Sequence, residues 1–185
     1  MRVIAGTARS LPLKTIEGMD TRPTTDRIKE TLFNMIQNEI PDCYFLDLFA
    51  GSGQMGIEAL SRGASYVFFV EKAPKVVTCI QDNIYFTKFQ EKCRVLNTDA
   101  ISGMRTLEGK YQFDIIFMDP PYECDLEKEV LRFLDKSSLL KPSTLLIIEA
   151  DLKTDFDYVE DYGFHILKEK KYKTNKHVFI EKIQE

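Results

Sequence analysis

The alternation of short apolar runs with amphipathic segments is the feature that most constrains the fold of this sequence. Strands with one exposed face alternate apolar and polar residues, whereas strands buried on both faces are continuously apolar. Predicted strands span residues 44–49, 66–70, 94–97, 113–118 and 145–149, and predicted helices span residues 24–38, 55–62, 73–86, 100–107 and 126–134. The alternation therefore predicts an α/β fold, in which helices cover both faces of a mostly parallel, doubly wound sheet.

The two ends of the chain depart from this alternation. Residues 164–170 and 177–183 are extended segments with only a short polar tract between them, which predicts an antiparallel hairpin at the edge of the sheet. Residues 3–5 and 13–16 are also short and extended. They predict a small β extension before the first helix.

Length and charge limit the classes of protein to which the chain can belong. Its 185 residues contain no repeat and no Gly/Ser linker. We therefore expect one domain, with an N-terminal extension and helix over residues 1–40 and a core over residues 41–185. The 25 basic and 29 acidic residues give a net charge of −4, which excludes binding to nucleic acid by bulk charge. Basic residues gather in residues 1–16 and 168–176, as either a solvated surface or a confined phosphate-contacting surface.

Metal sites, disulfides and membrane segments are not expected. The 4 cysteines include no Cys-x-x-Cys pair, and the 2 histidines add few further metal ligands. No apolar run approaches the roughly 18 residues that a membrane span needs. The start, MRVIAGTARS, lacks the apolar segment of a signal peptide. These features predict a cytoplasmic protein.

The turn after the first predicted strand carries the clearest sign of ligand binding. Gly51, Gly53 and Gly56 form the pattern GxGxxG between a strand and a helix. Glycines at these places permit a tight turn and let a ligand approach the backbone at the helix N-terminus. Glu71 ends the second predicted strand, where its carboxylate can accept both hydroxyl groups of a ribose. The turn and the carboxylate together predict a site for an adenosine-containing cofactor.

Two further acidic residues bear on the identity of this cofactor. Asp47, inside the first predicted strand, would repel a pyrophosphate but attract a cationic amino-acid group. Its charge favours S-adenosylmethionine, which joins a ribose to an ammonium and a sulfonium group, and a nicotinamide dinucleotide is the alternative. Asp99 follows the third predicted strand, where it can accept the adenine amino group, cap the next helix, or do both.

The tetrapeptide after the fourth predicted strand points to a reaction. It consists of Asp119, Pro120, Pro121 and Tyr122, at the edge of the sheet where open α/β folds place their chemistry. An amine on a base ring is a weak nucleophile because its lone pair is delocalised. If the Asp119 carboxylate and the Pro120 carbonyl accept its hydrogens, the lone pair becomes available to attack a methyl group. The prolines would make the loop rigid, and Tyr122 offers a ring on which a base can stack. The alternative is a plain proline turn that ends a strand.

Together these segments resemble class I methyltransferases that modify exocyclic amines. The match includes residues 47–64 and the tetrapeptide DPPY. The segments RVIAG (residues 2–6) and TRPTTDRIKETLFN (residues 21–34) resemble, more specifically, the RsmD-type family of bacterial 16S ribosomal RNA guanine-N2 methyltransferases. The resemblance implies a Rossmann-like methyltransferase fold without a metal. It also implies S-adenosylmethionine as methyl donor, S-adenosylhomocysteine as product, and N2 of a guanine in 16S ribosomal RNA, within the small ribosomal subunit, as acceptor.

The resemblance also implies roles for individual residues. The residues expected to bind the cofactor are Asp47, Phe49, Gly51, Ser52, Gly53, Glu71, Lys72, Asp99 and Ala100. The expected catalytic residues are Asp119, Pro120, Pro121 and Tyr122, and the expected RNA contacts are Arg2, Arg9, Arg22, Thr24 and Arg27. The segment from Arg22 to Arg27 can bind phosphate at a helix N-terminus, or it can simply cap that helix. Adenine-N6 methylation of DNA or RNA, and RNA binding without catalysis, are the alternative functions.

Overall fold

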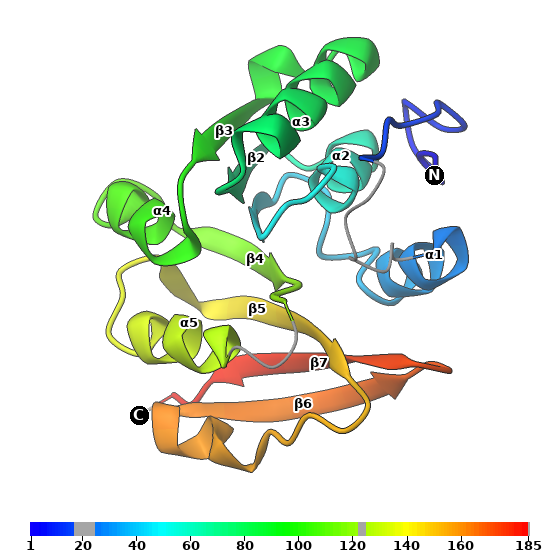
Figure 1. The fold of residues 1–185 in the computed structure, drawn as a ribbon. Helices are drawn as coiled ribbons and strands as arrows, with labels where there is room; N and C mark the ends of the chain where they lie inside the picture. Colours follow the sequence, from blue (N-terminus) through cyan, green and yellow to red (C-terminus); the bar gives the residue numbers. More distant parts are fainter. Residues whose placement is uncertain (17–24, 122–124, 185) are drawn as a thin grey trace.

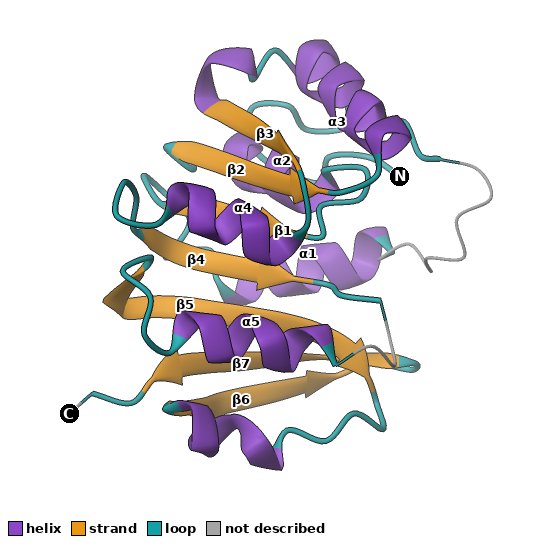
Figure 2. Ribbon diagram, turned by 60° about the vertical axis from the view of Figure 1, so that its left-hand side comes forward, coloured by secondary structure: helices purple, strands orange, loops and turns teal. Residues whose placement is uncertain are grey.

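The fold is a seven-stranded mixed sheet with helices on both faces (Figures 1 and 2). The computed structural model describes residues 1–16, 25–121 and 125–184. The strands are β1 (Tyr44–Leu48), β2 (Tyr66–Glu71), β3 (Cys93–Asn97), β4 (Phe113–Met118), β5 (Leu140–Asp151), β6 (Phe164–Lys171) and β7 (Asn175–Lys182). The α-helices are α1 (Asp26–Met35), α2 (Gln54–Ser61), α3 (Pro74–Thr87), α4 (Ala100–Leu107) and α5 (Leu126–Leu134), and short 3₁₀ helices η1 (Gln90–Lys92) and η2 (Asp157–Tyr162) complete the set.

The strand order β3-β2-β1-β4-β5-β7-β6 places a topological switch between β1 and β4. The strands β3, β2, β1, β4 and β5 run parallel, and β7 is antiparallel to both β5 and β6. In open α/β sheets the crevice at such a switch, beyond the carboxyl ends of the strands, is where ligands bind. The predicted doubly wound α/β fold and its C-terminal hairpin are therefore confirmed, and the switch directs attention to the ends of β1 and β4.

Two apolar cores hold the helices to the sheet, one on each face. On one face, side chains of α1, α2 and α3, among them Phe33, Ile57 and Ile80, pack against Phe69 and Phe117 of the sheet. On the other face, α4 and α5 pack against the opposite side chains of the same strands. Because successive residues of a strand point to opposite faces, each central strand supplies both cores. This explains why these strands are continuously apolar in sequence.

The strand β5 begins five residues earlier than its apolar run, at Leu140 instead of residue 145. The polar residues in this interval conceal the strand from a search for apolar runs. Its register against β4 also shifts between Phe113 and Ile115. At this irregularity the Thr144 hydroxyl donates a hydrogen bond to the Phe113 carbonyl at 2.7 Å. An irregular ladder with polar side chains does not give the pattern of a buried strand.

The small β extension predicted at residues 3–5 and 13–16 is present only as a minimal antiparallel pairing. In the N-terminal arm, residues 1–16, one isolated bridge joins Arg2 and Pro12, and the backbone N–H of Val3 donates to the Leu11 carbonyl at 3.0 Å. The N–H groups of Ile4 and Ala5 donate instead to the carboxylate of Glu58 in α2, at 2.8 and 3.1 Å. A helix side chain thus accepts the hydrogen bonds that the carbonyls of a neighbouring strand would otherwise have accepted.

Part of the basic run at residues 168–176 has a structural role. Lys176 is 5% exposed, forms an ion pair with Glu169 at 3.0 Å, and places its ammonium over the ring of Phe156. Lys168 lies over the ring of Phe179 in the same way. Neither lysine is therefore simply a solvated charge. The other basic residues of the run, Lys170, Lys171 and Lys173, are exposed around the turn of the hairpin.

Candidate active site at the ends of β1 and β4

The glycine turn between β1 and α2 has the backbone geometry that its sequence predicts. Gly51 and Gly53 have φ angles of 55° and 77°, in the left-handed region that favours glycine, and Gly53 caps α2. A Cβ on Gly51 would meet nothing within 4 Å, so the turn borders open space at this point. Phe49 also has a positive φ, of 63°, which is a strained conformation for an aromatic residue. Strain of this kind is typical of a ligand-binding turn.

Gly56 has a different role, because it lets α2 approach the sheet. A Cβ at this position would lie 2.3 Å from Cε1 of Phe69 and 2.7 Å from Cγ1 of Val67. The third glycine of the pattern therefore serves helix–strand packing, whereas the first two shape the turn.

Asp47 is buried in β1 beneath this turn. Its Oδ2 accepts a hydrogen bond from the Gly56 N–H at 3.0 Å, which fixes the first turn of α2 to the sheet. Burial raises the pKa of this carboxyl well above its usual range, the hydrogen bond opposes the shift, and the charge of Glu71 adds to it. A cation near Asp47 would relieve this unfavourable burial of negative charge.

Glu71 lies at the carboxyl end of β2, as predicted, and faces the glycine turn. Its two carboxylate oxygens accept hydrogen bonds from the backbone of Gly51 at 3.1 Å and of Ala73 at 2.9 Å. The Asn97 amide donates to the carbonyls of Glu71 and Lys72, both at 3.0 Å, and so fixes the loop after β2. The side chain of Glu71 is thus oriented from two sides beside the turn, while Lys72 is exposed.

Asp99 caps α4, which was one of its two predicted roles. Its Oδ1 accepts from the Ser102 N–H at 2.9 Å, and this hydrogen bond is the main reason why the pKa of Asp99 lies below its usual range. Its exposed carboxylate stands at the carboxyl end of β3 in the strand order, beside the end of β2. Ala100, the next residue, is buried in the core under α4.

Asp119 follows β4 directly and is half-buried at the switch point. Burial, followed by the negative charges of Glu149 and Asp47, raises its pKa well above the usual range. Pro120 is buried and Pro121 is exposed, so the rigid loop turns from the core toward the surface at this point. Tyr122 lies outside the described residues.

Four carboxyl groups line the same face of the sheet at its carboxyl edge. The register pairs Asp47 with Phe69 and Phe117, and it pairs Phe117 with Ile147. Two residues further along each strand, on the same face, stand Glu71, Asp119 and Glu149. This row of acids crosses the switch point, and it favours a ligand that carries positive charge.

A polar group at the far end of this row, around Glu149, was not predicted from the sequence. His177 in β7 is fully buried, with Nε2 3.1 Å from Glu149 Oε2 and Nδ1 3.1 Å from the Tyr172 hydroxyl. Asn175 donates to the other oxygen of Glu149 at 2.6 Å. Glu149 ends its apolar run as Glu71 does, so the same pattern could have identified it. His177 and Asn175 carry no such signal.

Asn83 in α3 is a second residue that the sequence analysis missed. Its side-chain amide donates to the carbonyl of Ser52 in the glycine turn at 2.9 Å and to the carbonyl of Lys14 at 3.1 Å, and its Oδ1 accepts from the Lys14 N–H at 2.8 Å. One buried amide therefore connects the N-terminal arm to the glycine turn. A single asparagine inside a helical pattern gives no warning of this role.

Three of the five predicted RNA contacts lie in the described residues. Arg2 is exposed and pairs with Asp26 at the start of α1 at 3.2 Å, and Arg27 is exposed one residue further along that helix. Arg9 is exposed on the N-terminal arm. Thr25 caps α1, through a hydrogen bond from the Ile28 N–H at 3.3 Å. Arg22 and Thr24 lie outside the described residues.

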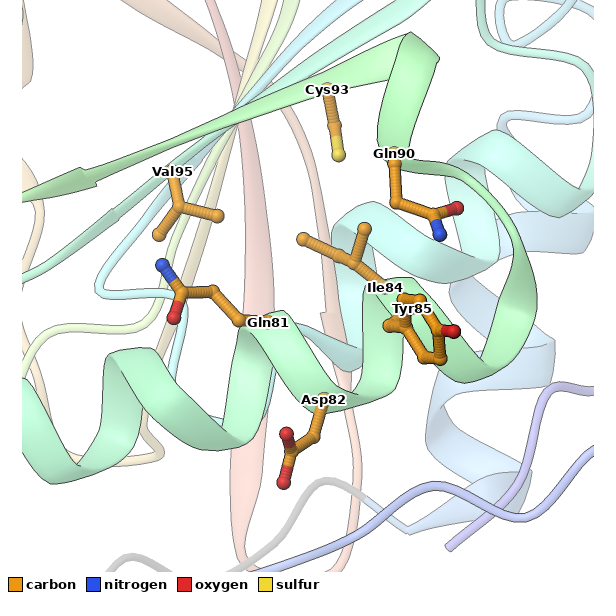
Figure 3. A pocket seen from close by; sticks show the side chains of 7 residues that line it. All are labelled: Gln81, Asp82, Ile84, Tyr85, Gln90, Cys93 and Val95. Atoms are coloured by element: carbon orange, nitrogen blue, oxygen red, sulfur yellow. The ribbon is translucent and has the colours of Figure 1, made fainter.

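A shallow hollow of about 450 Å³ between α3 and β3 is separate from this row of acids. Figure 3 shows Gln81 and Ile84 pointing toward β3, with Cys93 and Val95 opposite. Cys93 begins β3 and Val95 is its middle residue, whereas the candidate site uses the carboxyl ends of the strands. Within residues 1–16, 25–121 and 125–184, no helix has the length and apolar character that a membrane span requires, and no cluster of three potential ligands could hold a metal ion.

Comparisons with known proteins agree on a family. A family model described as "Conserved hypothetical protein 95" matches residues 1–181. Ribosomal RNA small subunit methyltransferase D from Haemophilus influenzae is 36% identical over 173 residues, covering 92% of this chain and 88% of the relative. The protein of that name from Escherichia coli K12 is 34% identical over 153 residues, covering 83% of this chain and 76% of the relative. A solved structure of yhhF from Escherichia coli, described as a candidate methyltransferase, superposes with a TM-score of 0.87 at 28% identity, covering 100% of this chain and 99% of that chain. Because the family model spans nearly the whole chain and the named relatives match most of its length, the chain belongs to the RsmD-type methyltransferase family.

Proposed function

We propose that this protein transfers a methyl group from S-adenosylmethionine to the N2 amine of a guanine in 16S ribosomal RNA, within the small ribosomal subunit. One observation carries the proposal most directly. The carboxylate of Asp119 stands at the topological switch point, next in the strand order to the glycine turn of β1. A cofactor on the turn and an amine at Asp119 would therefore be neighbours. The names of the relatives support small-subunit ribosomal RNA as the substrate.

The residues around the turn fit S-adenosylmethionine. The open space beside Gly51 gives room for the ligand, and Glu71 holds a carboxylate at the place where a ribose would lie. Asp47 and the neighbouring acids would favour the positive sulfonium and ammonium groups, but they would repel the pyrophosphate of a dinucleotide. Phe49, Ser52, Gly53, Lys72, Asp99 and Ala100 complete the proposed cofactor site.

The chain's own groups prepare the amine for transfer. When bound, S-adenosylmethionine supplies a methyl group on a sulfonium sulfur, which leaves with the electrons of the S–C bond. The Asp119 carboxylate and the Pro120 carbonyl would accept the two amine hydrogens, so that the nitrogen lone pair points at the methyl carbon. As the N–C bond forms, Asp119 takes the proton that the nitrogen loses. Alignment and electrostatics then account for most of the acceleration.

Exposed basic residues near the site would contact the RNA backbone. Arg2 and Arg27 stand together at the start of α1, and Arg9 lies on the N-terminal arm. The N-terminus of α1 adds the positive end of a helix dipole. Arg22, Thr24 and Tyr122 belong to the same proposal on sequence grounds alone.

The test uses donor with a labelled methyl group. We expect the protein to label 16S ribosomal RNA in small subunits from cells that lack this activity, and mass spectrometry of nucleosides to identify N2-methylguanosine. The variant Asp119→Ala should lose transfer while it still binds donor in calorimetry. Labelled N6-methyladenosine would favour the adenine alternative, and RNA binding without any transfer would favour a non-catalytic role.

A further inference from the structure

A buried polar group stands behind Asp119 that the proposed mechanism has not used. Glu149 follows Ile148 on β5 just as Asp119 follows Met118 on β4, and the register pairs Met118 with Ile148. The two carboxyl groups therefore stand side by side, one directly after β4 and the other near the carboxyl end of the neighbouring parallel strand β5. Glu149 is 3% exposed, so water screens its charge little.

Two side chains of the hairpin hold Glu149 in place, and a third contacts one of these two. Asn175 donates to its Oε1 at 2.6 Å, and the Nε2 of His177 lies 3.1 Å from its Oε2. Both residues are buried, and the register places His177 directly opposite Glu149 on β7. The hydroxyl of Tyr172, 3.1 Å from Nδ1 of His177, extends the network toward the turn of the hairpin. Burying such a network costs free energy, because each member must be desolvated. Its presence therefore calls for a functional reason.

The electrostatic environment shows where the charge of Glu149 acts. Burial is the largest cause of the raised pKa of Asp119, and the negative charge of Glu149 is the second largest. Burial and the charge of Glu149 also raise the pKa of Tyr172 to about 12. Other titratable or charged groups near the pair are Asp47 on β1, Glu127 of α5 in the small hollow that Glu149 and Pro120 also line, and Lys170, opposite His177 on β6. Lys170 is exposed, so it does not neutralise the buried pair.

We propose that Glu149 is a positioning residue for methyl transfer: held by Asn175 and His177, it keeps its negative charge beside Asp119 and so makes Asp119 a strong proton acceptor for the target amine. The inference rests on the proposed function and deepens it. An ordinary carboxylate is a poor base for the proton that the nitrogen loses, whereas a carboxylate beside a second buried negative charge binds a proton more tightly. The C-terminal hairpin then has a defined purpose, which is to fix that second charge.

The variant Glu149→Gln tests this role with little change in shape. The Gln oxygen can still accept from Asn175, and its NH₂ group can donate to His177 once the ring takes the other tautomer. Single-turnover transfer, with RNA and donor saturating, should fall about tenfold at the pH optimum while KM for both substrates stays unchanged. The acidic limb of the pH profile should move to lower pH by about one unit or more. Glu149→Asp, which keeps the charge, should retain the position of that limb.

Controls separate this role from a structural one and from failure of the proposed function. Glu181→Gln removes a half-buried carboxylate of β7, the strand that carries Asn175 and His177; it pairs with His165 at 2.9 Å, and its loss should leave the pH profile unchanged. A wild-type protein that transfers no methyl group would refute the proposed function. A wild-type protein that transfers, together with a Glu149→Gln variant whose acidic limb stays in place, would overturn the inference. The melting temperature of the variants provides a second readout without activity. It should fall less in Glu149→Gln than in the wild type as the pH rises above the usual range of a carboxyl group.

Discussion

The variant Glu58→Gln should destabilise the fold strongly through a single buried charge. Glu58 and Lys29 are both fully buried, and their charged groups lie 3.9 Å apart. Glu58 also accepts from Arg62 at 2.8 Å, in addition to the two backbone N–H groups of the N-terminal arm. Burial lowers the pKa of Lys29, and the charge of Glu58 is the largest effect that opposes this. The substitution therefore leaves a desolvated ammonium without its nearest counter-charge.

The size of the effect follows from this geometry. Removing one partner of a buried ion pair costs about 3–5 kcal/mol. In a chain of this length each kcal/mol lowers Tm by about 2–4 °C, so we expect a decrease between about 6 and 20 °C. The chain has no tryptophan, so thermal unfolding is best followed by circular dichroism.

A matched control and a second substitution make this prediction specific. Glu30→Gln, beside Lys29 on α1 but exposed, should change stability by no more than about 0.5 kcal/mol. Adding Lys29→Met to Glu58→Gln should recover part of the loss, because the fully buried ammonium is then absent; the part not recovered reflects Arg62, which also loses its carboxylate partner. A Tm for Glu58→Gln within about 2 °C of the wild type would refute the reasoning.

Three further predictions concern the candidate site. Gly56→Ala should cost about 1–3 kcal/mol, because its Cβ would overlap the Phe69 ring; urea unfolding measures this, and a variant as stable as the wild type would contradict the packing role of Gly56. Glu71→Ala should weaken donor binding about tenfold or more in calorimetry, and an unchanged affinity would exclude Glu71 as the ribose ligand. The raised pKa of Asp119 means that the folded state binds its proton more tightly than the unfolded state, so this group's contribution to stability falls as pH rises through the raised pKa. Asp119→Asn should therefore raise Tm relative to the wild type by an amount that grows as the pH rises, while it lowers transfer by about 100-fold or more; a Tm difference that does not grow with pH would refute the electrostatic argument.

The sequence by itself determined the features that depend on local chemistry. Apolar runs marked the central strands, since a strand buried on both faces must be apolar throughout. The glycines at 51 and 53 were identifiable because few other residues tolerate the left-handed conformation of this turn. Asp119 and Glu71 were located because each directly follows or ends an apolar run, and parallel strands bring such ends to one edge.

Only the tertiary structure decided which groups, distant in the sequence, interact through their charges or through hydrogen bonds. The partners of Glu58 include the N–H of Ile4, 54 residues away, and Asn175 reaches Glu149 across 26 residues. The pairing within the N-terminal arm stops at one bridge, and the N–H groups of Ile4 and Lys14 find side-chain partners on α2 and α3, which nothing within residues 1–16 indicates. Side-chain hydrogen bonds and buried charges depend on the position of both groups in space, whereas periodicity records only the environment of one residue at a time. For this reason the sequence predicted the fold, the glycine turn with Glu71, and the position of Asp119. It did not predict the network that fixes Glu149 beside Asp119.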